Sequence, residues 1–336
     1  MNNILAHLIA HNNPSSLKMY GSLFRVVAFG LLNYNVLAAL SASQPVQRPP
    51  GLWPHLAEQG RASRPLIDFI DGYFTAKNLH QPEAWISYFH PTEGTYGDVG
   101  LGNLFAQPQL GPVIETLMGT WAPDSKSYPL RIVGDTNSAL LYMVDTPDMF
   151  GDELRVLVAL DFKDGLIVRE VDYWDPRRNA AAKANRQPPE QYPTDFASAL
   201  SSNTTNITLR GVVSRFSSAL SNGDYKSAVS LLAPDVVLED FSLRARIDGR
   251  LAVEKYLKRA VVSLPYGTGS VVNHIVGNEE GGAYEWTGTP KAVGRNGITA
   301  IELDEGNLIT RLTSVWDTFN ASDNTMESLV RLSIEP

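Results

Sequence analysis

One segment of this sequence occurs twice, and this internal repeat limits the possible folds more than any other feature. Leu166-Ile167-Val168-Arg169 leads to Trp174-Asp175, and Leu308-Ile309-Thr310-Arg311 leads to Trp316-Asp317. The two tryptophans are 142 positions apart in the 336-residue chain, and a glycine-containing turn signal precedes each segment. Solenoid repeats have periods of about 20–50 residues, so this spacing indicates two copies of a whole domain.

The two copies show the same predicted order of elements. Apolar residues three and four positions apart over 66–74 and 209–220 predict an amphipathic helix at the start of each copy. Two shorter helices and a brief strand follow. Three or four strands then close each copy, at 128–133, 139–144, 154–162 and 166–174 in the first and at 271–276, 283–287, 297–303 and 308–316 in the second. Helices followed by a run of antiparallel strands predict an α+β fold with the sheet curved around the helices.

Residues 1–63 differ from both copies and are expected to form a separate N-terminal segment. Lys18 and Arg25 precede an apolar stretch that ends at residue 40, and small residues follow at 41–43. This order is typical of a signal peptide. Asparagines at 33 and 35 interrupt the stretch, and the alternative is an amphipathic helix that packs on the protein or on a partner. The stretch is too short to cross a bilayer as a helix, so we expect no stable membrane insertion, and export and a cytoplasmic location both stay open.

The remaining domain boundaries follow from the repeat and from composition. We expect the first domain over residues 64–178, a linker over 179–205 and the second domain over 206–336. The region that joins the two copies is rich in Ala, Asn, Pro, Ser and Thr, which is typical of a linker. A second proline-rich linker, over 45–54, precedes the first domain.

Composition and missing motifs narrow the chemistry. The chain has 28 Lys and Arg against 36 Asp and Glu, a formal net charge of −8, which argues against nucleic-acid binding. It has no cysteine, which excludes disulfides, Cys-ligated zinc, iron–sulfur clusters and thiol nucleophiles. The six histidines lack metal-ligand spacing, and no dinucleotide, Walker or nucleophile-elbow motif is present. We therefore expect neither a cofactor nor a metal.

The order of elements and the closing strands, which end in Trp174-Asp175 and Trp316-Asp317, resemble the NTF2-like superfamily and within it the SnoaL-like proteins. The resemblance covers nearly all of 64–178 and 205–320. It implies two cone-shaped domains, in each of which a bent antiparallel sheet wraps a long helix and leaves a pocket at the open end. Members include polyketide cyclases, ketosteroid isomerases, epoxide hydrolases, dehydratases and pure binding or dimerisation modules. Many pair sheet to sheet, so the resemblance also implies an intrachain pseudo-dimer or a homodimer, while fold alone selects no activity.

Carboxylates on the strands of the first copy are the candidates for proton chemistry, because burial in apolar walls raises a carboxyl pKa towards neutrality. Asp145 ends one strand and Asp172 lies on the last one. In the limonene-epoxide-hydrolase branch, an Arg-x-Asp and a second Asp activate water. Asp145 and Asp172 resemble these two acids, but Met143 stands where the arginine is expected. Without that arginine, an Asp pair could share a proton and catalyse isomerisation, cyclisation or dehydration.

Further candidates lie on the early strand and the helices. Tyr96 and Asp98 resemble the pocket-mouth residues of SnoaL-like cyclases, and His90 lies at a helix end. We expect Asp145 or Asp98 to act as base and Tyr96, His90 or Asp172 to polarise a carbonyl. The alternatives are that Asp145 caps a turn, that Asp172 faces solvent and that His90 ends a helix. The residues expected to contact substrate, with core packing as the alternative, are Tyr73, Trp85, Phe89, Tyr142 and Trp174 in the first copy and Glu239 and Trp286 in the second.

The second copy does not keep the paired carboxylates. At an offset of 142, Asp145 corresponds to Thr287, Met143 to Glu285 and Asp172 to Ser314. We favour a structural role for this copy, in which it pairs with the first. The alternative is a pocket of its own around Glu239 and Asp240.

The sequence therefore predicts a cofactor-free, SnoaL-like enzyme with its pocket in the first domain. The expected reaction is acid–base chemistry by an isomerase, cyclase, dehydratase or epoxide-opening enzyme. The expected substrate is an apolar small molecule of secondary metabolism, such as a polyketide or a terpenoid. The alternative is a non-catalytic protein, exported or not, that binds a small molecule or dimerises.

Overall fold

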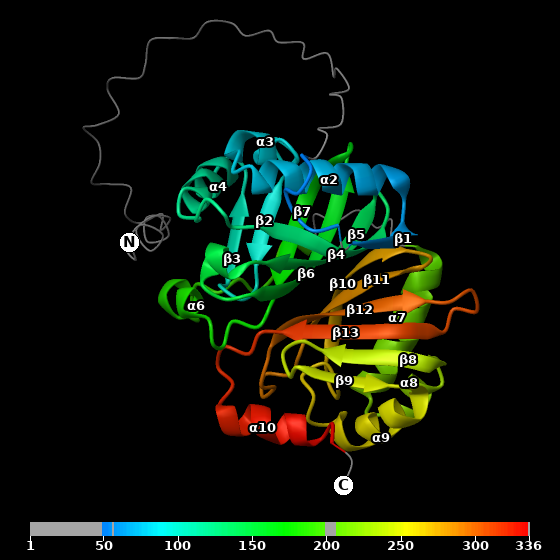
Figure 1. The fold of residues 1–336 in the computed structure, drawn as a ribbon. Helices are drawn as coiled ribbons and strands as arrows, with labels where there is room; N and C mark the ends of the chain where they lie inside the picture. The colour runs from blue at the N-terminus through cyan, green and yellow to red at the C-terminus, as the bar shows by residue number, and fades with distance from the viewer. Residues whose placement is uncertain (1–48, 56, 199–205, 335–336) are drawn as a thin grey trace, which may run out of the picture. The chain divides into compact units, whose positions relative to one another are not determined.

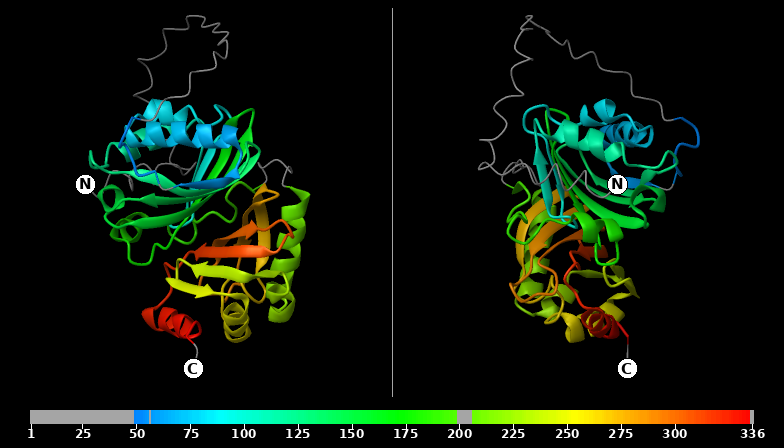
Figure 2. Two further views of the ribbon diagram at one scale, coloured as in Figure 1. Left: turned by 45° about the vertical axis from the view of Figure 1, so that its right-hand side comes forward. Right: turned by 90° about the vertical axis from the view of Figure 1, so that its left-hand side faces the viewer.

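The computed structural model describes residues 49–55, 57–198 and 206–334. The signal peptide predicted within the first 43 residues lies outside the described residues. A compact unit that spans Arg48–Pro336 contains two lobes, each with its own sheet (Figures 1 and 2). None of the described helices is both long and apolar enough to cross a membrane.

The first lobe contains a seven-stranded sheet in the order β1-β4-β5-β6-β7-β2-β3. Its central strands β4 to β7 are antiparallel, whereas β1 pairs parallel with β4 and β2 pairs parallel with β7. The strands are β1 (Glu58–Ala62), β2 (Thr95–Asp98), β3 (Asn103–Ala106), β4 (Ser127–Gly134), β5 (Ser138–Asp145), β6 (Leu154–Lys163) and β7 (Leu166–Tyr173). Strand β1 lies within the range predicted as the N-terminal segment.

The long helix of the first lobe is α2 (Arg64–Asn78), and it lies across the side of the sheet that faces away from the second lobe (Figure 1). Ser63 caps this helix, because its hydroxyl accepts a hydrogen bond from the Leu66 amide at 3.4 Å. At the other end, Asn78 exchanges two hydrogen bonds with the backbone of Ser127 on β4. The shorter helices are α3 (Pro82–Ile86), α4 (Leu110–Met118) and α5 (Pro147–Phe150).

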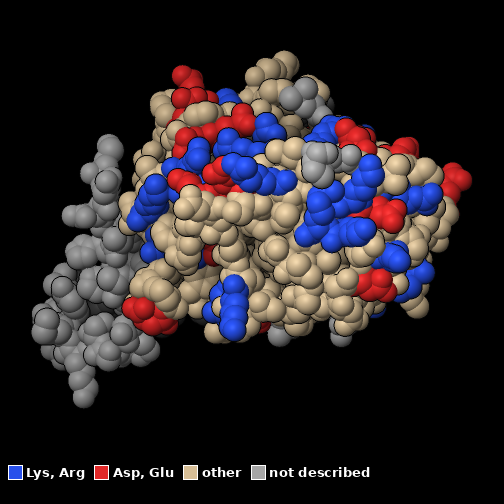
Figure 3. All heavy atoms as spheres, turned by 90° about the horizontal axis from the view of Figure 1, so that it is seen from below, with Lys and Arg blue, Asp and Glu red and all other residues tan. Residues whose placement is uncertain are grey.

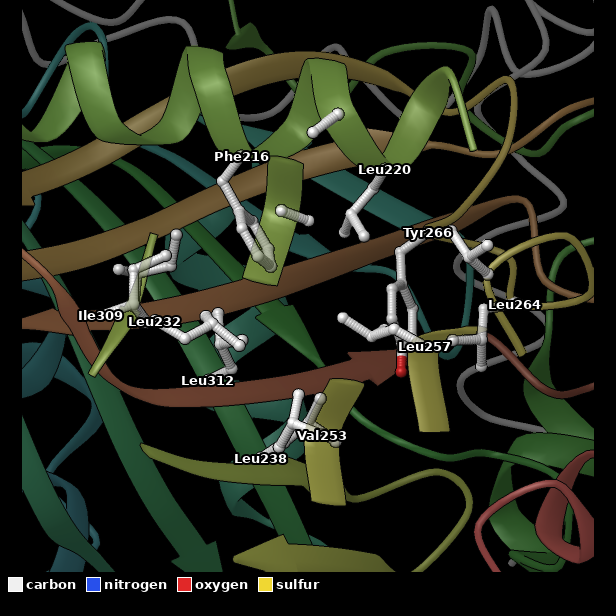
Figure 4. Packing of buried hydrophobic residues seen from close by; sticks show 14 of the residues in the cluster. Phe216, Leu220, Leu232, Leu238, Val253, Leu257, Leu264, Tyr266, Ile309 and Leu312 are labelled. Atoms are coloured by element: carbon white, nitrogen blue, oxygen red, sulfur yellow. The ribbon is translucent and has the colours of Figure 1, made fainter. Parts of the chain in front are cut away.

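The second lobe repeats this plan with a six-stranded sheet in the order β10-β11-β12-β13-β8-β9. Its strands are β8 (Leu232–Asp240), β9 (Ala245–Asp248), β10 (Val271–Asn278), β11 (Gly281–Thr287), β12 (Asn296–Leu303) and β13 (Ile309–Trp316). Its helices are α7 (Ile207–Ser221), α8 (Tyr225–Val229), α9 (Arg250–Ala260) and α10 (Asp323–Arg331). Figure 4 shows that Phe216 and Leu220 of α7 point into an apolar core that also contains Leu257 and Leu312. The predicted α+β fold is confirmed in both lobes.

The strand register corrects part of the predicted correspondence between the copies. Leu141 pairs with Val158, which pairs with Asp172. In the same places of the second sheet, Tyr284 pairs with Thr299, which pairs with Ser314. Asp172 and Ser314 therefore correspond at an offset of 142, but Leu141 and Tyr284 correspond at 143, because the connecting turns differ in length. The counterparts of Asp145 and Met143 are then Gly288 and Trp286 rather than Thr287 and Glu285.

The two sheets pack against each other through their outer faces. Strands β4, β5 and β6 contact β10 and β11, and the shared apolar cluster includes Leu157, Val171 and Tyr173 of the first lobe and Ile298 and Val315 of the second. Arg169 is buried in this interface, where it bonds to Glu285 at 2.7 Å. The range predicted as a linker contributes helix α6 (Ala180–Asn185) and Phe196, whose carbonyl accepts a hydrogen bond from Arg169. The two copies thus form a sheet-to-sheet pair within one chain.

Candidate functional site

A small cavity of about 50 Å³ lies inside the first lobe. Its polar lining comes from Lys77 of α2, Tyr96 and Asp98 of β2, Asp145 at the end of β5 and Asp172 of β7. Its apolar lining includes Trp85, Trp121, Phe150, Val156 and Trp174, and the linker helix contributes Ala181 and Ala182. Alternation along β7 explains the arrangement, because Glu170, Asp172 and Trp174 point into the cone whereas Val171 and Tyr173 face the second lobe.

Two buried acids on β7, Glu170 and Asp172, have a tyrosine partner each. The Tyr96 hydroxyl donates to Asp172 Oδ2 at 2.9 Å, and the Tyr73 hydroxyl donates to Glu170 Oε1 at 2.7 Å. Burial raises the pKa of Asp172 well above its usual range, and the nearby Glu170 charge raises it further. Burial also raises the pKa of Glu170, to about 7. The pair therefore holds a proton to a higher pH than ordinary carboxyl groups do, and Asp172 is the member of the pair at the cavity wall.

One oxygen of each of these acids lacks a hydrogen-bond partner within the described residues. Among the described residues, Asp172 Oδ1 and Glu170 Oε2 are buried without a hydrogen-bond partner. A buried polar atom normally has such a partner, because leaving it unsatisfied costs free energy. Asp172 lines the cavity and Glu170 does not, so Asp172 is the acid that a ligand would meet.

Lys77 and Asp145 form a buried ion pair in the same cavity. Lys77 Nζ lies 3.6 Å from Asp145 Oδ1, and both side chains are 5% exposed. The ammonium also lies 5.4 Å from the centre of the Trp85 ring, within the range of a cation–π interaction. A buried charge needs a partner, so Lys77 balances one carboxylate of a cavity that otherwise contains acids.

Asp98 has a different environment, and this environment recurs in the second lobe. It accepts hydrogen bonds from the Leu101 amide at 2.8 Å and from Trp174 Nε1 at 3.0 Å. Asp240, its counterpart at an offset of 142, accepts from the Leu243 amide at 2.9 Å and from Trp316 Nε1 at 3.2 Å. Burial raises the pKa of each acid to about 6. The Asp–Trp contact also occurs in the second lobe, whose interior is packed with apolar side chains. We therefore assign this contact a structural role in closing the sheet.

Seven of the predicted site residues lie in or beside the cavity, and five lie elsewhere. The cavity contains Tyr96, Asp98, Asp145, Asp172, Trp85 and Trp174, and Tyr73 lies behind it on Glu170. His90 lies outside, where its ring accepts a hydrogen bond from the Glu93 amide in a loop, and Phe89 is part of the apolar core.

The other three predicted residues lie away from the cavity, in places that the alternation of residues along a strand could not predict. Tyr142 is on the opposite face of β5, in the interface between the sheets, where it contacts Arg131. Glu239 is on the outer face of β8 and pairs with Arg311. Trp286 fills the core of the second lobe, and its Nε1 donates to Thr299.

Sequence reasoning missed Lys77 and Glu170, although each left a signal. Lys77 continues the buried stripe of α2, seven positions after Ile70 and four after Tyr73, where an apolar residue is expected. Glu170 is two positions before Asp172 and so lies on the same face of β7. In the described part of the chain, no group of three or more His, Asp or Glu is placed to hold a metal ion.

The face of the molecule shown in Figure 3 has no continuous field of one charge sign. On the face shown in Figure 3, Lys and Arg are interspersed with Asp and Glu. This distribution differs from the basic stripe that tracks a phosphate backbone. The buried polar groups of the first lobe therefore remain the candidates for a functional site.

Comparisons with known proteins concern the fold. No protein-family model matches the chain, and no curated protein matches it significantly. Similar solved structures include a steroid delta-isomerase from Pseudomonas aeruginosa, with 13% identity and a TM-score of 0.31, that covers 39% of this chain and 93% of its own. An NTF-2 like protein of unknown function from Burkholderia xenovorans is 20% identical, with a TM-score of 0.28 and coverage of 36% and 91%. A SnoaL-like protein of unknown function from Burkholderia thailandensis is 12% identical, with a TM-score of 0.29 and coverage of 32% and 94%.

These similarities support no inference about site residues or substrates. The architecture expected from the resemblance is present in the structure, because each lobe has a mainly antiparallel sheet and a 15-residue helix.

Proposed function

We propose that this protein is an acid–base enzyme that moves a proton within a small, mostly apolar molecule carrying a carbonyl or a similar polar group. One observation carries the proposal: Asp172, whose pKa burial raises well above its usual range, shares a cavity with the Lys77–Asp145 ion pair. An acid that donates and a carboxylate that accepts are the two parts of general acid–base catalysis.

The mechanism follows from these roles. The Asp145 carboxylate removes a proton from the carbon next to the carbonyl, and negative charge develops on the carbonyl oxygen. The protonated Asp172 donates a hydrogen bond to that oxygen, and the Lys77 ammonium stabilises the charge electrostatically. Asp145 then returns the proton to a different carbon, so that the product is an isomer of the substrate. Cyclisation and dehydration begin with the same removal of a proton by Asp145. In cyclisation the enolate carbon then bonds to a second carbonyl carbon, whose oxygen takes the proton of Asp172. In dehydration the enolate expels a hydroxyl group from the next carbon, which takes the proton of Asp172 and leaves as water.

Deuterium exchange into a small ketone tests this proposal without knowledge of the natural substrate. Butanone in D2O with the wild-type protein is expected to gain deuterium next to its carbonyl faster than in buffer alone, as measured by NMR. Asp145→Asn is expected to lower the protein-dependent rate by at least about 100-fold. Asp235→Asn, which changes an exposed acid on β8, is the matched control and should keep the wild-type rate. The proposal would be contradicted if the wild-type protein did not raise the exchange rate above that in buffer, or if Asp145→Asn kept the wild-type rate.

A non-catalytic binding protein is the second candidate, and the lining of the cavity favours it. Three tryptophans line the cavity, and aromatic walls of this kind hold an apolar ligand whether or not it reacts. If the protein only binds, a ligand protects it against unfolding while butanone exchange stays at the buffer rate.

A further inference from the structure

A second hollow, a cleft of about 680 Å³, lies beside the cavity. The two share Leu154, Trp174 and Asn179 in their linings. The cleft has walls from both lobes: residues around Arg155 and Arg178 come from the first lobe and its linker, and Phe241, Arg244 and Arg246 come from the second. A molecule that extends out of the cavity would therefore lie in this cleft.

The cavity alone is too small for the substrate classes considered above. About 50 Å³ accommodates the reactive end of a molecule, whereas the cleft has the volume of an ordinary ligand pocket. The side chains that line the cleft then indicate the chemistry of the part of the substrate that lies outside the cavity.

The acids that line the cleft are already engaged by groups of the protein. Glu153 pairs with Arg155 at 3.2 Å, and Glu239 pairs with Arg311 at 2.5 Å. Among the others, Asp152 accepts from Asn179, Asp175 accepts from the Thr318 hydroxyl, and Asp240 is buried on its tryptophan and tyrosine partners. Two arginines of the second wall differ in this respect, because Arg246 pairs with Asp248 whereas Arg244 has no ion-pair or hydrogen-bond partner within the described residues. Arg244 is thus the cleft arginine whose guanidinium no group of the described residues holds, so it can bind a ligand.

The backbone at Arg244 also sets this residue apart. Its φ is +55°, in the left-handed region that favours glycine. Its counterpart in the first lobe, at the offset of 142 that relates Asp98 to Asp240, is Gly102, with a φ of +72°. A Cβ on Gly102 would lie 2.4 Å from the Tyr192 ring. The second lobe therefore has an arginine at a backbone position where the fold favours glycine, and unfavourable backbone conformations of this kind concentrate at functional sites.

We propose that the cleft binds the acidic end of an elongated, otherwise apolar substrate whose reactive end enters the cavity, and that Arg244 of the second lobe recognises the acidic group. The inference rests on the proposed function, since it takes the cavity as the place of reaction. A guanidinium matches a carboxylate or a phosphate with two parallel hydrogen bonds. The second lobe then has a role beyond pairing with the first, because it supplies part of the substrate-binding wall.

A pair of ten-carbon probes that differ in their end group tests this role. Decanoate and decanol have the same chain, and binding to the full protein is measured by calorimetry and by the fluorescence of the tryptophans that line both hollows. The wild-type protein is expected to bind decanoate more tightly than decanol. Arg244→Gly should weaken decanoate binding about tenfold and leave decanol binding as it was. This variant should keep or raise the melting temperature, because glycine suits the left-handed backbone.

Controls and contrary outcomes make the test decisive. Arg244→Lys keeps the positive charge but lacks the planar guanidinium, so its affinity for decanoate should lie between those of the wild type and Arg244→Gly. Arg210→Ala, which removes an exposed arginine of α7, should bind both probes as the wild type does. Equal affinities for the two probes, unchanged decanoate binding by Arg244→Gly, or no binding of either probe would each overturn the proposal. A decanol analogue that carries a phosphate distinguishes the two kinds of acidic group.

The experiment also separates this inference from the proposed function. The probe measurements involve binding only, whereas the butanone measurements involve proton transfer only. If decanoate binding depends on Arg244 but the protein does not exchange butanone, the proposed binding site in the cleft is supported and the proposed enzymatic activity is contradicted. If the protein exchanges butanone but binds decanoate and decanol equally, the enzymatic activity is supported and the binding site in the cleft is contradicted.

Discussion

The two lobes share one order of elements but have opposite interiors. Helices α2 and α7 each have 15 residues and begin after a capping Ser63 and Asn206, so Tyr73 corresponds to Phe216 and Lys77 to Leu220. On the strands, Tyr96 corresponds to Leu238 and Glu170 to Leu312. All four apolar counterparts pack together in the core shown in Figure 4. The first lobe has polar groups at the positions where the second has Phe and Leu.

This difference shows which residues the fold needs and which it only tolerates. The Asp–Trp contact occurs in both lobes, so it belongs to the fold. The tyrosines, Lys77 and Glu170 occur only in the first lobe, and burying such groups costs more free energy than burying Phe or Leu. The fold forms with an apolar interior in the second lobe and does not require these groups, which fits the function proposed for the first lobe.

The largest expected effect concerns Asp172 and its counterpart Ser314. Asp172→Asn replaces a carboxylic acid with an amide, which is a much weaker hydrogen-bond donor to the developing oxyanion, so the rate of deuterium exchange into butanone should fall by about 100-fold. Ser314→Ala changes the same strand position in the second lobe and should leave the rate unchanged. Equal rates in the two variants would mean that the first lobe is not the place of reaction.

A charge placed in the second interior should be poorly tolerated. Leu312→Glu puts a carboxylate at the position of Glu170, but there it faces Leu220 and Phe216 in place of a lysine and a tyrosine. The free energy of unfolding at pH 8 should fall by about 4 kcal/mol, as measured with urea. A loss below 1 kcal/mol would show that this interior accepts acids as the first does.

The reverse change should make the first lobe less sensitive to pH. The pKa of Glu170 is about 7 in the folded protein against 4.5 in the unfolded chain, so the folded state binds more protons between these values. Stability from this acid is therefore complete below about pH 4.5 and is lost as the pH rises to 7, by about 3 kcal/mol. Tyr73→Phe with Glu170→Leu copies the second lobe and should make the fall of unfolding free energy over this range shallower by that amount. An unchanged pH dependence would contradict the assignment of the shift to Glu170.

The smallest effect concerns the contact that both lobes share. Asp98→Ala and Asp240→Ala each leave a buried indole N–H and an amide without a partner, which costs about 2 kcal/mol of unfolding free energy, and Asp240→Ala also removes the acceptor of the Tyr266 hydroxyl. The two losses should agree within about 1 kcal/mol by urea unfolding. A much larger loss of butanone exchange in Asp98→Ala than its instability explains would give Asp98 a part in the chemistry.

The sequence was sufficient for the fold and for part of the site, and strand chemistry explains the division. The repeat predicted two α+β copies, and the two-residue period of β7 places Asp172 in the cone with Trp174. On β5 the same reasoning could not assign Tyr142, because every residue of this strand is buried and both faces are apolar. A lysine in the apolar stripe of α2 indicated a buried charge, but its partner Asp145 is 68 positions away and was visible only in three dimensions. The uniform offset between the copies failed on β5 and β11 because turns of different length connect the strands.

Infrared spectroscopy at pH 7 tests the central claim most directly, namely that the first lobe contains a carboxylic acid protonated at neutral pH. The difference spectrum between the wild type and Asp172→Asn should show the loss of a protonated carboxyl C=O band, with Ser314→Ala as the variant that loses none. If Asp172→Asn removes only a carboxylate band, Asp172 is ionised at neutral pH, and the acid–base account of this cavity is wrong.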